Sequence, residues 1–463
     1  VTRAHFGLGL TPRRILSSLE GHEVGDNRAM AVKVPQIGPA TPEEADLEGL
    51  NPFRDSIMHQ CPHMYFRRMQ QETPLFDVEG TDVHIVTRHE LIVPLVRDTE
   101  TFSNRFGSAG EPPKGDVLEK IKAVLATGWP QVPTMLTIDP PYHTRFRNTV
   151  ASFFTPRKIA ELRPLIEEYV DSIMDKFINR PDKTMEFVRD FAVPLPIAAI
   201  ASILSVPLDK MADLKRWSDD SIATIGSSIS DDRRIEALTG VMEMQRYFAG
   251  RLEEKRANPS DDLLTALVTA EIDTDEGTKR LLEIPEMLSI IAQLLTAGNE
   301  TTTNTFAEGM LYFAENMDVW EKVRQDRTLI GPAVEEILRL SSPSGGMFRV
   351  VTKDNVEIDG CPVPKGDRVM LMYSAANRDP KVWGDTPDQF DPLRPNLKEH
   401  LAFGKGIHFC IGAPLARLEL QVAFERMADR LKSWSLLETN DFRYHDSFML
   451  RGLKKLDLSF EVA

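Results

Sequence analysis

The chain has 463 residues, of which 42% are hydrophobic and 27% are charged, and its formal net charge is −15. This composition is ordinary for a soluble protein with a large buried core, and the length alone suggests two or three domains. The acidic charge argues against nucleic acid as a general partner, because phosphate binding needs a basic surface.

Cysteine usage and the first residues indicate the compartment. The three cysteines, Cys61, Cys361 and Cys410, are widely spaced and odd in number, so they do not form a disulfide framework. A reducing compartment fits this pattern best. The chain begins without a long apolar run and without signal-peptide architecture. We therefore expect a soluble, cytoplasmic protein without a membrane anchor.

The N-terminal part is predicted to be irregular at first and then to contain a helix and two strands. Residues 1–50 are rich in charge, proline and glycine without periodicity, which indicates a partly irregular lead-in. A helix is expected over residues 65–69, followed by a hairpin of strands at 75–78 and 83–86. Residues 108–132 predict a mobile loop that contains a short helix at 117–125.

The next motif is Asp-Pro-Pro-Tyr-His-Thr-Arg-Phe-Arg over residues 139–147. An aspartate before two prolines can start a helix, and His143 and Arg147 then share one face because they are four residues apart. A solvated basic face is one interpretation, and a site for carboxylates is the other.

Apolar periodicity predicts further helices at 162–178, 197–204 and 240–256 and a long helix at 284–317. The centre of the long helix reads Ala297-Gly298-Asn299-Glu300-Thr301. Glycine and threonine weaken a helix interior. Gly298 could allow close packing against a neighbouring helix, but we favour a local widening of the helix that makes space for a small molecule.

Glu336 and Arg339 are three residues apart, so on a helix they can form an ion pair, which we interpret as structural. Strands are then expected at 356–358 and 368–373. The segment 403–412 follows and reads Phe-Gly-Lys-Gly-Ile-His-Phe-Cys-Ile-Gly. Its glycines suit a tight loop, and a helix begins just after it with Pro414 in the first turn.

Cys410 lies just before this helix. A thiol at a helix N-terminus faces free N–H groups and the positive end of the dipole, which favour the thiolate, the form that binds metal. A buried structural cysteine is the alternative for a single cysteine.

The loop resembles the haem-binding loop of bacterial cytochrome P-450 enzymes, Phe-Gly-x-Gly-x-His-x-Cys-x-Gly, at every fixed position. Three other motifs of that family occur in the right order: Asp-Pro-Pro-x-His-x-x-x-Arg from 139, Gly-x-Glu-Thr from 298, and Glu-x-x-Arg from 336. The resemblance extends from about residue 60 to the end.

The resemblance implies a mainly α fold with small β-sheets (α+β), a triangular prism of helices around a buried haem b. Residues 51–463 would form one catalytic domain after the lead-in. Cys410 would be the axial ligand of the iron, with the N–H groups near Ile411 and Gly412 softening the charge of the sulfur. Phe403 would pack beside the sulfur, and Gly404 belongs to the same loop. The haem propionates would be bound by four side chains: His143, Arg147, Arg349 and His408.

The resemblance also implies a monooxygenase that inserts one oxygen atom of O2 into a hydrophobic small molecule, by hydroxylation or a related oxidation such as dealkylation or epoxidation. Glu300 and Thr301 would relay protons and hold water near the bound oxygen. The substrate would be lined by apolar residues: Leu294, Ala297, Met347, Phe348, Phe448 and Met449.

Electrons would come from a ferredoxin-type donor with a separate reductase, because the sequence has no flavin or nicotinamide fingerprint. Four cations around the cysteine loop either suit an acidic partner or are simply solvated: Arg394, Lys398, Lys405 and Arg417.

Two other functions fit the same family: a peroxygenase that uses H2O2, and a non-catalytic haem sensor or electron carrier. The Glu300–Thr301 pair argues against both. A hydrolase is disfavoured because no Gly-x-Ser-x-Gly motif occurs. The identity of the substrate, the regiochemistry and the oligomeric state stay open.

Overall fold

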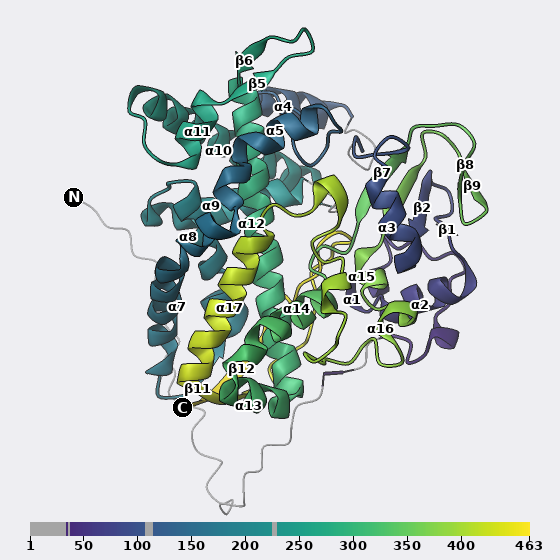
Figure 1. Ribbon diagram of the computed structural model, residues 1–463, viewed down its shortest axis with the longest axis vertical. Helices are drawn as coiled ribbons and strands as arrows, with labels where there is room; N and C mark the ends of the chain where they lie inside the picture. The colour runs from purple at the N-terminus through teal and green to yellow at the C-terminus, as the bar shows by residue number, and fades with distance from the viewer. Residues whose placement is uncertain (1–33, 36–37, 107–113, 225–228) are drawn as a thin grey trace, which may run out of the picture.

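The structure is a computed structural model, and it describes residues 34–35, 38–106, 114–224 and 229–463. Helices dominate it (Figure 1). The α-helices are α1 (Ser56–Gln60), α2 (His63–Glu72), α3 (His89–Arg97), α4 (Asp116–Leu125), α5 (Tyr142–Ala151), α6 (Pro156–Ala160), α7 (Arg163–Ile178), α8 (Pro194–Ile203), α9 (Met211–Ala223), α10 (Asp231–Ala257), α11 (Leu263–Thr269), α12 (Ile284–Glu315), α13 (Met317–Gln325), α14 (Ile330–Ser341), α15 (Tyr373–Ala376), α16 (Pro380–Trp383) and α17 (Ala413–Arg430).

Short 3₁₀ segments and one π-helical turn occur between these helices. The 3₁₀ segments are η1 (Pro42–Glu44), η2 (Ser152–Phe154), η4 (Leu208–Lys210), η5 (Arg327–Leu329), η6 (Leu397–Glu399) and η7 (Gly406–His408), and the π-helical turn is η3 (Val188–Ala192).

The strands are short and form small sheets. They are β1 (Phe76–Asp77), β2 (Val83–Val86), β3 (Phe102–Ser103), β4 (Thr184–Glu186), β5 (Glu271–Asp273), β6 (Lys279–Leu281), β7 (Met347–Val351), β8 (Val356–Ile358), β9 (Cys361–Val363), β10 (Arg368–Leu371), β11 (Leu431–Leu436) and β12 (Asp457–Val462).

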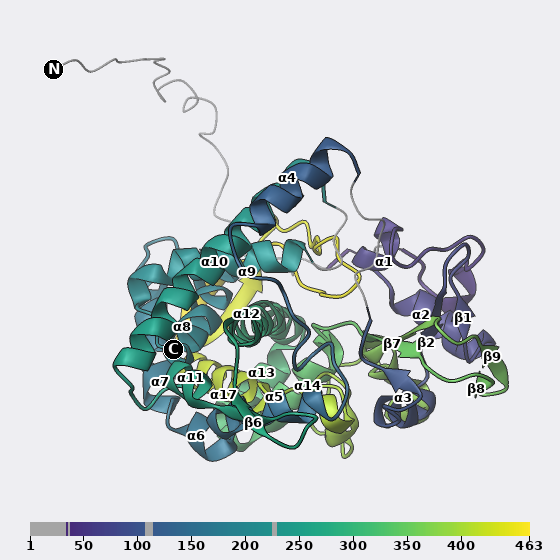
Figure 2. The ribbon, with the colours of Figure 1, turned by 90° about the horizontal axis from the view of Figure 1, so that it is seen from above.

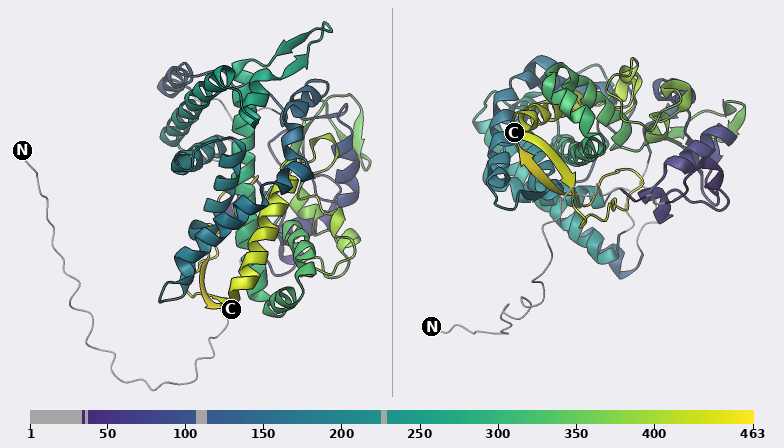
Figure 3. Two further views of the ribbon diagram at one scale, coloured as in Figure 1. Left: turned by 60° about the vertical axis from the view of Figure 1, so that its left-hand side comes forward. Right: turned by 90° about the horizontal axis from the view of Figure 1, so that it is seen from below.

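The largest sheet has the order β1-β2-β10-β7-β3, in which only the β2–β10 pair is parallel. It lies with α1, α2 and α3 on one side of the molecule, away from the helical part (Figure 1). A second sheet has the order β11-β12-β4, and β11 and β12 lie beside the helices near the C-terminus (Figure 3). The α+β architecture predicted from the family resemblance is confirmed.

Helix α12 is the centre of the helical part. Figure 2 views it end-on, with other helices arranged around it, and it packs against α8, α9, α10, α14 and α17. A capping box of Glu283 and Glu286 fixes its start, with Pro285 in the first turn. Gly309 permits the closest approach of α17, because a Cβ there would lie 2.9 Å from Phe424 Cζ. Helix α12 therefore lies at the centre of the helical part and contains Glu300 and Thr301 of the predicted site.

Most predicted elements are present with altered bounds. The predicted helices at 65–69, 117–125, 162–178, 197–204, 240–256 and 284–317 correspond to α2, α4, α7, α8, α10 and α12. The strand predicted at 75–78 is shorter, and the strand predicted to reach Tyr373 ends at Leu371, after which Tyr373 begins α15. Residues 1–33 and 36–37 of the predicted lead-in and residues 108–113 of the predicted mobile loop lie outside the described residues.

The predicted widening of the long helix is wrong. Residues 284–315 are α-helical throughout, including Gly298. A Cβ built on Gly298 would lie 3.5 Å from Ile200 Cδ1 of α8, so this glycine lies against a neighbouring helix. This distance is an ordinary van der Waals contact, so a Cβ would fit at residue 298 and the packing against α8 does not by itself require glycine.

The largest sheet contains a pH-dependent contact at His84. The ring of His84 is within 2.5 Å of an Asp77 oxygen through Nδ1 and within 3.0 Å of an Asp367 oxygen through Nε2. Burial lowers the pKa of His84, but the hydrogen bonds to Asp367 and Asp77 outweigh it and raise the pKa above its ordinary value. The protonated ring is therefore stabilised in the folded protein.

A raised pKa in the folded state adds stability below the unfolded pKa of about 6.5, and this stability is lost as the pH rises through the folded value. As the pH rises from acidic to alkaline, we expect the wild type to lose about 1 kcal/mol or less of unfolding free energy that His84→Gln does not lose. The effect is small because Asp77 is largely exposed. Urea unfolding of both proteins on each side of this range measures the difference. Parallel pH profiles would contradict the assignment.

Candidate active site

The cysteine loop has the backbone that its glycines predict. Gly404 and Gly406 have φ angles of 63° and 71°, in the left-handed region that side chains rarely adopt. The loop closes on itself through the Cys410 N–H, which donates to the Phe403 carbonyl at 2.9 Å. Helix α17 begins at Ala413. The turn therefore holds the Cys410 sulfur at the start of α17.

The electrostatics of Cys410 differ from the prediction. Burial raises the pKa of its thiol, and this effect exceeds the opposite effects of the Gly412 and Ala413 N–H groups and of Arg147 and Arg417. The N–H groups at the start of α17 favour the thiolate as predicted, but the loss of solvation costs more than they recover. A metal cation bound to the sulfur supplies the positive charge that would favour the thiolate.

Four basic side chains gather beside the loop. His143 comes from α5, and its ring centre lies 4.2 Å from that of His408. Arg147, one turn further along α5, donates to the Phe409 carbonyl at 2.6 Å. Arg349 comes from β7 and is 1% exposed. The structure thus brings together residues that are up to 265 positions apart in the predicted set.

These side chains have donors without acceptors. Among the described residues, both ring nitrogens of His143, Nε2 of His408 and Nε of Arg349 have no hydrogen-bond partner. Burial lowers the pKa of all three, with His143 further lowering that of His408, to about 3. Buried donors without partners cost free energy, so the cluster fits an anionic group with several acceptors.

On α12, Thr301 and Glu300 lie next to each other. The Thr301 hydroxyl donates to the Ala297 carbonyl at 2.9 Å, which leaves its oxygen free to accept a hydrogen bond. Burial raises the pKa of Glu300. Lys215 of α9 lowers this pKa and Asp219 of α9 raises it, both by less than burial does. Ala297 is exposed although α12 is central, so the helix presents an open face here.

The predicted substrate-lining residues are only partly brought together. The ring centres of Phe348 and Phe448 are 6.1 Å apart. The Met449 carbonyl accepts a hydrogen bond from the Gly345 N–H, just before β7, at 2.8 Å. Leu294 is buried in the helical core around α12, and Met347 packs against a separate core under the largest sheet.

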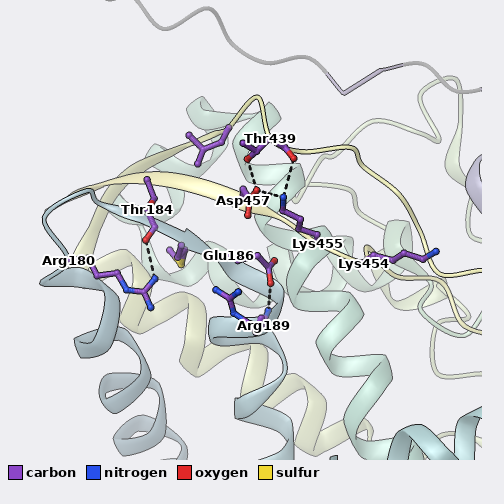
Figure 4. A pocket seen from close by; sticks show the side chains of 10 residues that line it. Arg180, Thr184, Glu186, Arg189, Thr439, Lys454, Lys455 and Asp457 are labelled. Carbon is purple, nitrogen blue, oxygen red and sulfur yellow. Dashed lines mark hydrogen bonds and ion pairs between the residues drawn. The ribbon is translucent and has the colours of Figure 1, made fainter. Parts of the chain in front are cut away.

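A surface pocket of 580 Å³ lies at β4 and β12 and contains none of the predicted site residues (Figure 4). Its carboxylates are already paired: Glu186 accepts from the N–H of Arg189 at 2.8 Å, and Asp457 lies 2.6 Å from Lys455 Nζ. The pocket is therefore not part of the candidate site.

The predicted basic patch is smaller than expected. Arg394 is 7% exposed and pairs with Glu336 at 3.0 Å, so it belongs to the interior. Arg417 pairs with Glu335 at 2.6 Å and stacks on Phe403. Lys405 pairs with the exposed Glu399, and Lys398 is exposed. Of the four, Lys398 is exposed, whereas Lys405 and Arg417 are partly exposed and already ion-paired.

Two features were missed from the sequence. Tyr373 hydrogen-bonds to Arg349 across the site, although it had been assigned to a strand. The α9 pair Lys215 and Asp219 influences Glu300, and no motif in the sequence had indicated this pair. The four-residue spacing of this charged pair was the available signal for the second feature.

The family is now established by comparison. A family model described as Cytochrome P450 matches residues 49–453, and the chain belongs to the cytochrome P450 family. It is 34% identical over 401 residues to the cytochrome P450 monooxygenase PikC of Streptomyces venezuelae, covering 86% of this chain and 90% of that protein.

Solved structures agree with this assignment. CYP109Q5 from Chondromyces apiculatus is 32% identical with a TM-score of 0.75, covering 89% of this chain and 98% of that one. CYP109E1 from Bacillus megaterium in complex with testosterone is 26% identical with a TM-score of 0.73, covering 88% and 99%.

The family implies a haem-thiolate cofactor, and the residues present fit it. They provide one sulfur donor and beside it a set of unpaired donors suited to the two carboxylates of a porphyrin. Among the residues that the structure describes, no helix is long and apolar enough to cross a membrane.

Proposed function

We propose that residues 51–463 form a haem-thiolate monooxygenase domain that binds haem b through Cys410 and inserts one oxygen atom of O2 into a hydrophobic small molecule. The observation that carries the proposal is the buried cluster of unpaired basic donors beside the Cys410 loop. A cysteine with only a structural role would not require such a cluster.

The residues of the chain have separate tasks. Cys410 ligates the iron, while His143, Arg147, Arg349 and His408 bind the propionates and so orient the cofactor. When bound, the haem supplies the oxidising chemistry, which electron donation from the thiolate favours. Phe403, Gly404, Ile411 and Gly412 shape the loop that holds the sulfur.

Glu300 and Thr301 handle protons and water. A carboxyl group with a raised pKa keeps its proton closer to neutral pH, as a proton donor requires. The Thr301 oxygen accepts a hydrogen bond from water while its own hydroxyl hydrogen is donated to the Ala297 carbonyl.

We expect Thr301→Ala to raise the hydrogen peroxide formed per dioxygen consumed by about tenfold, because water and protons are then delivered without control. Peroxide and oxygen are measured with a surrogate ferredoxin and reductase. Thr303→Ala is the matched control, since its hydroxyl donates instead to the Ala192 carbonyl at 3.0 Å. Equal peroxide yields in Thr301→Ala and the wild type would exclude Thr301 from the relay.

A hydrophobic substrate is supported by the apolar ring pair Phe348 and Phe448 and by the testosterone bound to CYP109E1. The predicted lining also includes Leu294, Ala297, Met347 and Met449. A ferredoxin-type donor with a separate reductase is the proposed electron source, and Lys398, Lys405 and Arg417 keep exposed surface with which to contact it.

Isotope labelling tests the proposed reaction. A hydrophobic compound that shifts the spin state of the haem should acquire label from labelled dioxygen when reducing equivalents are supplied. Label that comes only from hydrogen peroxide would favour the peroxygenase instead, and no incorporation from either source would favour a sensor or electron carrier.

A further inference from the structure

A row of polar side chains follows one face of α12 beyond the candidate site. Glu300, Asn304, Glu308 and Tyr312 are spaced four residues apart, so successive members are neighbours on the helix surface. Asn304 and Glu308 are 2% and 3% exposed. A row of buried polar groups in a helix packed by apolar residues needs hydrogen-bond partners to be stable.

The C-terminal segment covers this row. It is the yellow chain beside α12 in Figure 2. Gly452 lies so close that a Cβ there would be 2.0 Å from Asn304 Oδ1. The side chain of Tyr444 hydrogen-bonds to Glu308, and burial followed by the charge of Glu308 raises the pKa of that tyrosine. Tyr444 therefore acts as a hydrogen-bond donor to Glu308.

Several atoms around the row have no partner among the described residues. They are Asn304 Nδ2, Glu308 Oε1 and Arg378 Nε. Buried polar atoms of this kind are usually satisfied by ordered water, and the mixture of donors and an acceptor here suits water rather than an apolar ligand. The row thus has polar atoms on which water can be held between Glu308 and the candidate site.

A small cavity lies near Tyr444, at Arg451. It has a volume of 30 Å³, large enough for water, and its mainly apolar lining includes the polar residues His59, Ser447 and Arg451. Nε2 of His59 has no partner among the described residues. The Arg451 guanidinium lies 3.5 Å from the centre of the Tyr444 ring. Polar groups therefore continue from this cavity through Tyr444 to Glu308.

We propose that Asn304 and Glu308 hold a chain of water molecules that carries protons from the Tyr444 side to Glu300. Glu308 takes a proton from water on the Tyr444 side and gives one to a bound water, and a proton of that water passes to the Glu300 carboxylate. No electrons move. Glu308 acts through Glu300, so it is a positioning residue, and its role rests on the proposed monooxygenase function.

Glu308→Gln separates proton transfer from packing, because glutamine keeps the shape and an acceptor for Tyr444 but no longer exchanges a carboxyl proton. We expect dioxygen consumption with surrogate redox partners to slow by about tenfold, with a larger solvent deuterium isotope effect than in the wild type. Glu308→Asp should restore much of the rate. Glu357→Gln, at an exposed position of β8, is the matched control and should leave both quantities unchanged.

Two outcomes would overturn the relay. One is a Glu308→Gln holoenzyme with the rate and isotope effect of the wild type. The other is a high-resolution structure of the holoenzyme in which no water lies within hydrogen-bond distance of Asn304 Nδ2 and Glu308 Oε1. Either result leaves the monooxygenase proposal standing as long as the wild type has a thiolate-ligated haem, so the two failures are distinguishable.

Discussion

Replacing Glu336 by glutamine should destabilise the protein by about 3–5 kcal/mol, because it leaves a buried guanidinium without its counter-charge. Glu336 and Arg339 are both 0% exposed, and Arg339 Nε lies 2.6 Å from Glu336 Oε2. The other oxygen of Glu336 accepts from the Asp391 N–H and from Arg394 Nε, each at 3.0 Å.

The same network holds the segment that leads to the cysteine loop. Arg339 donates to the carbonyls of Asn377 and Pro387, each at 2.7 Å. Loss of the pair should therefore also reduce the haem content of the purified protein. Urea unfolding and the ratio of haem to protein measure the two effects.

The control for Glu336 is an exposed pair of similar spacing. Lys322 and Asp318 lie 3.2 Å apart on α13 with both side chains largely exposed. Asp318→Asn should change stability by about 0.5 kcal/mol or less. A Glu336→Gln protein as stable as Asp318→Asn would show that the buried network is dispensable.

Replacing Cys410 by serine should abolish oxygen insertion while leaving the fold in place. The backbone N–H of residue 410 still closes the loop on the Phe403 carbonyl, so the turn should form. A serine hydroxyl is a much weaker donor to the iron than a thiolate. Circular dichroism checks the fold, and product formation from labelled dioxygen checks the chemistry.

Cys61 and Cys361 are the other free cysteines, and Cys61→Ser is the control for Cys410→Ser. It should retain full activity. Wild-type product yields in Cys410→Ser would remove this residue from the site.

Much of the candidate site could be predicted from the sequence because its motifs are local. Six fixed positions within ten residues identified the Cys410 loop, and its two left-handed glycines explain why those positions need glycine. The face shared by His143 and Arg147 followed from helical spacing in the same way. The long central helix was predictable from its apolar pattern and its proline at the start.

Other features depend on tertiary packing, which local patterns do not contain. The dipole argument for Cys410 omitted burial, which outweighs the N–H groups of α17. The widening at Gly298 was wrong because Ile200, far away in sequence, lies beside this glycine. Arg394 looked like a surface cation until the fold placed it against Glu336. The pairing of Glu308 with Tyr444 joins residues 136 positions apart and had no signal in either segment.

The measurement that tests the central claim most directly is the carbon monoxide difference spectrum of the dithionite-reduced holoprotein. A strongly red-shifted Soret band is the predicted result, because a thiolate opposite the carbon monoxide donates electron density to the iron. A band without this shift, as for histidine-ligated haem, or a protein that binds no haem, would contradict ligation by Cys410 and the monooxygenase proposal built on it.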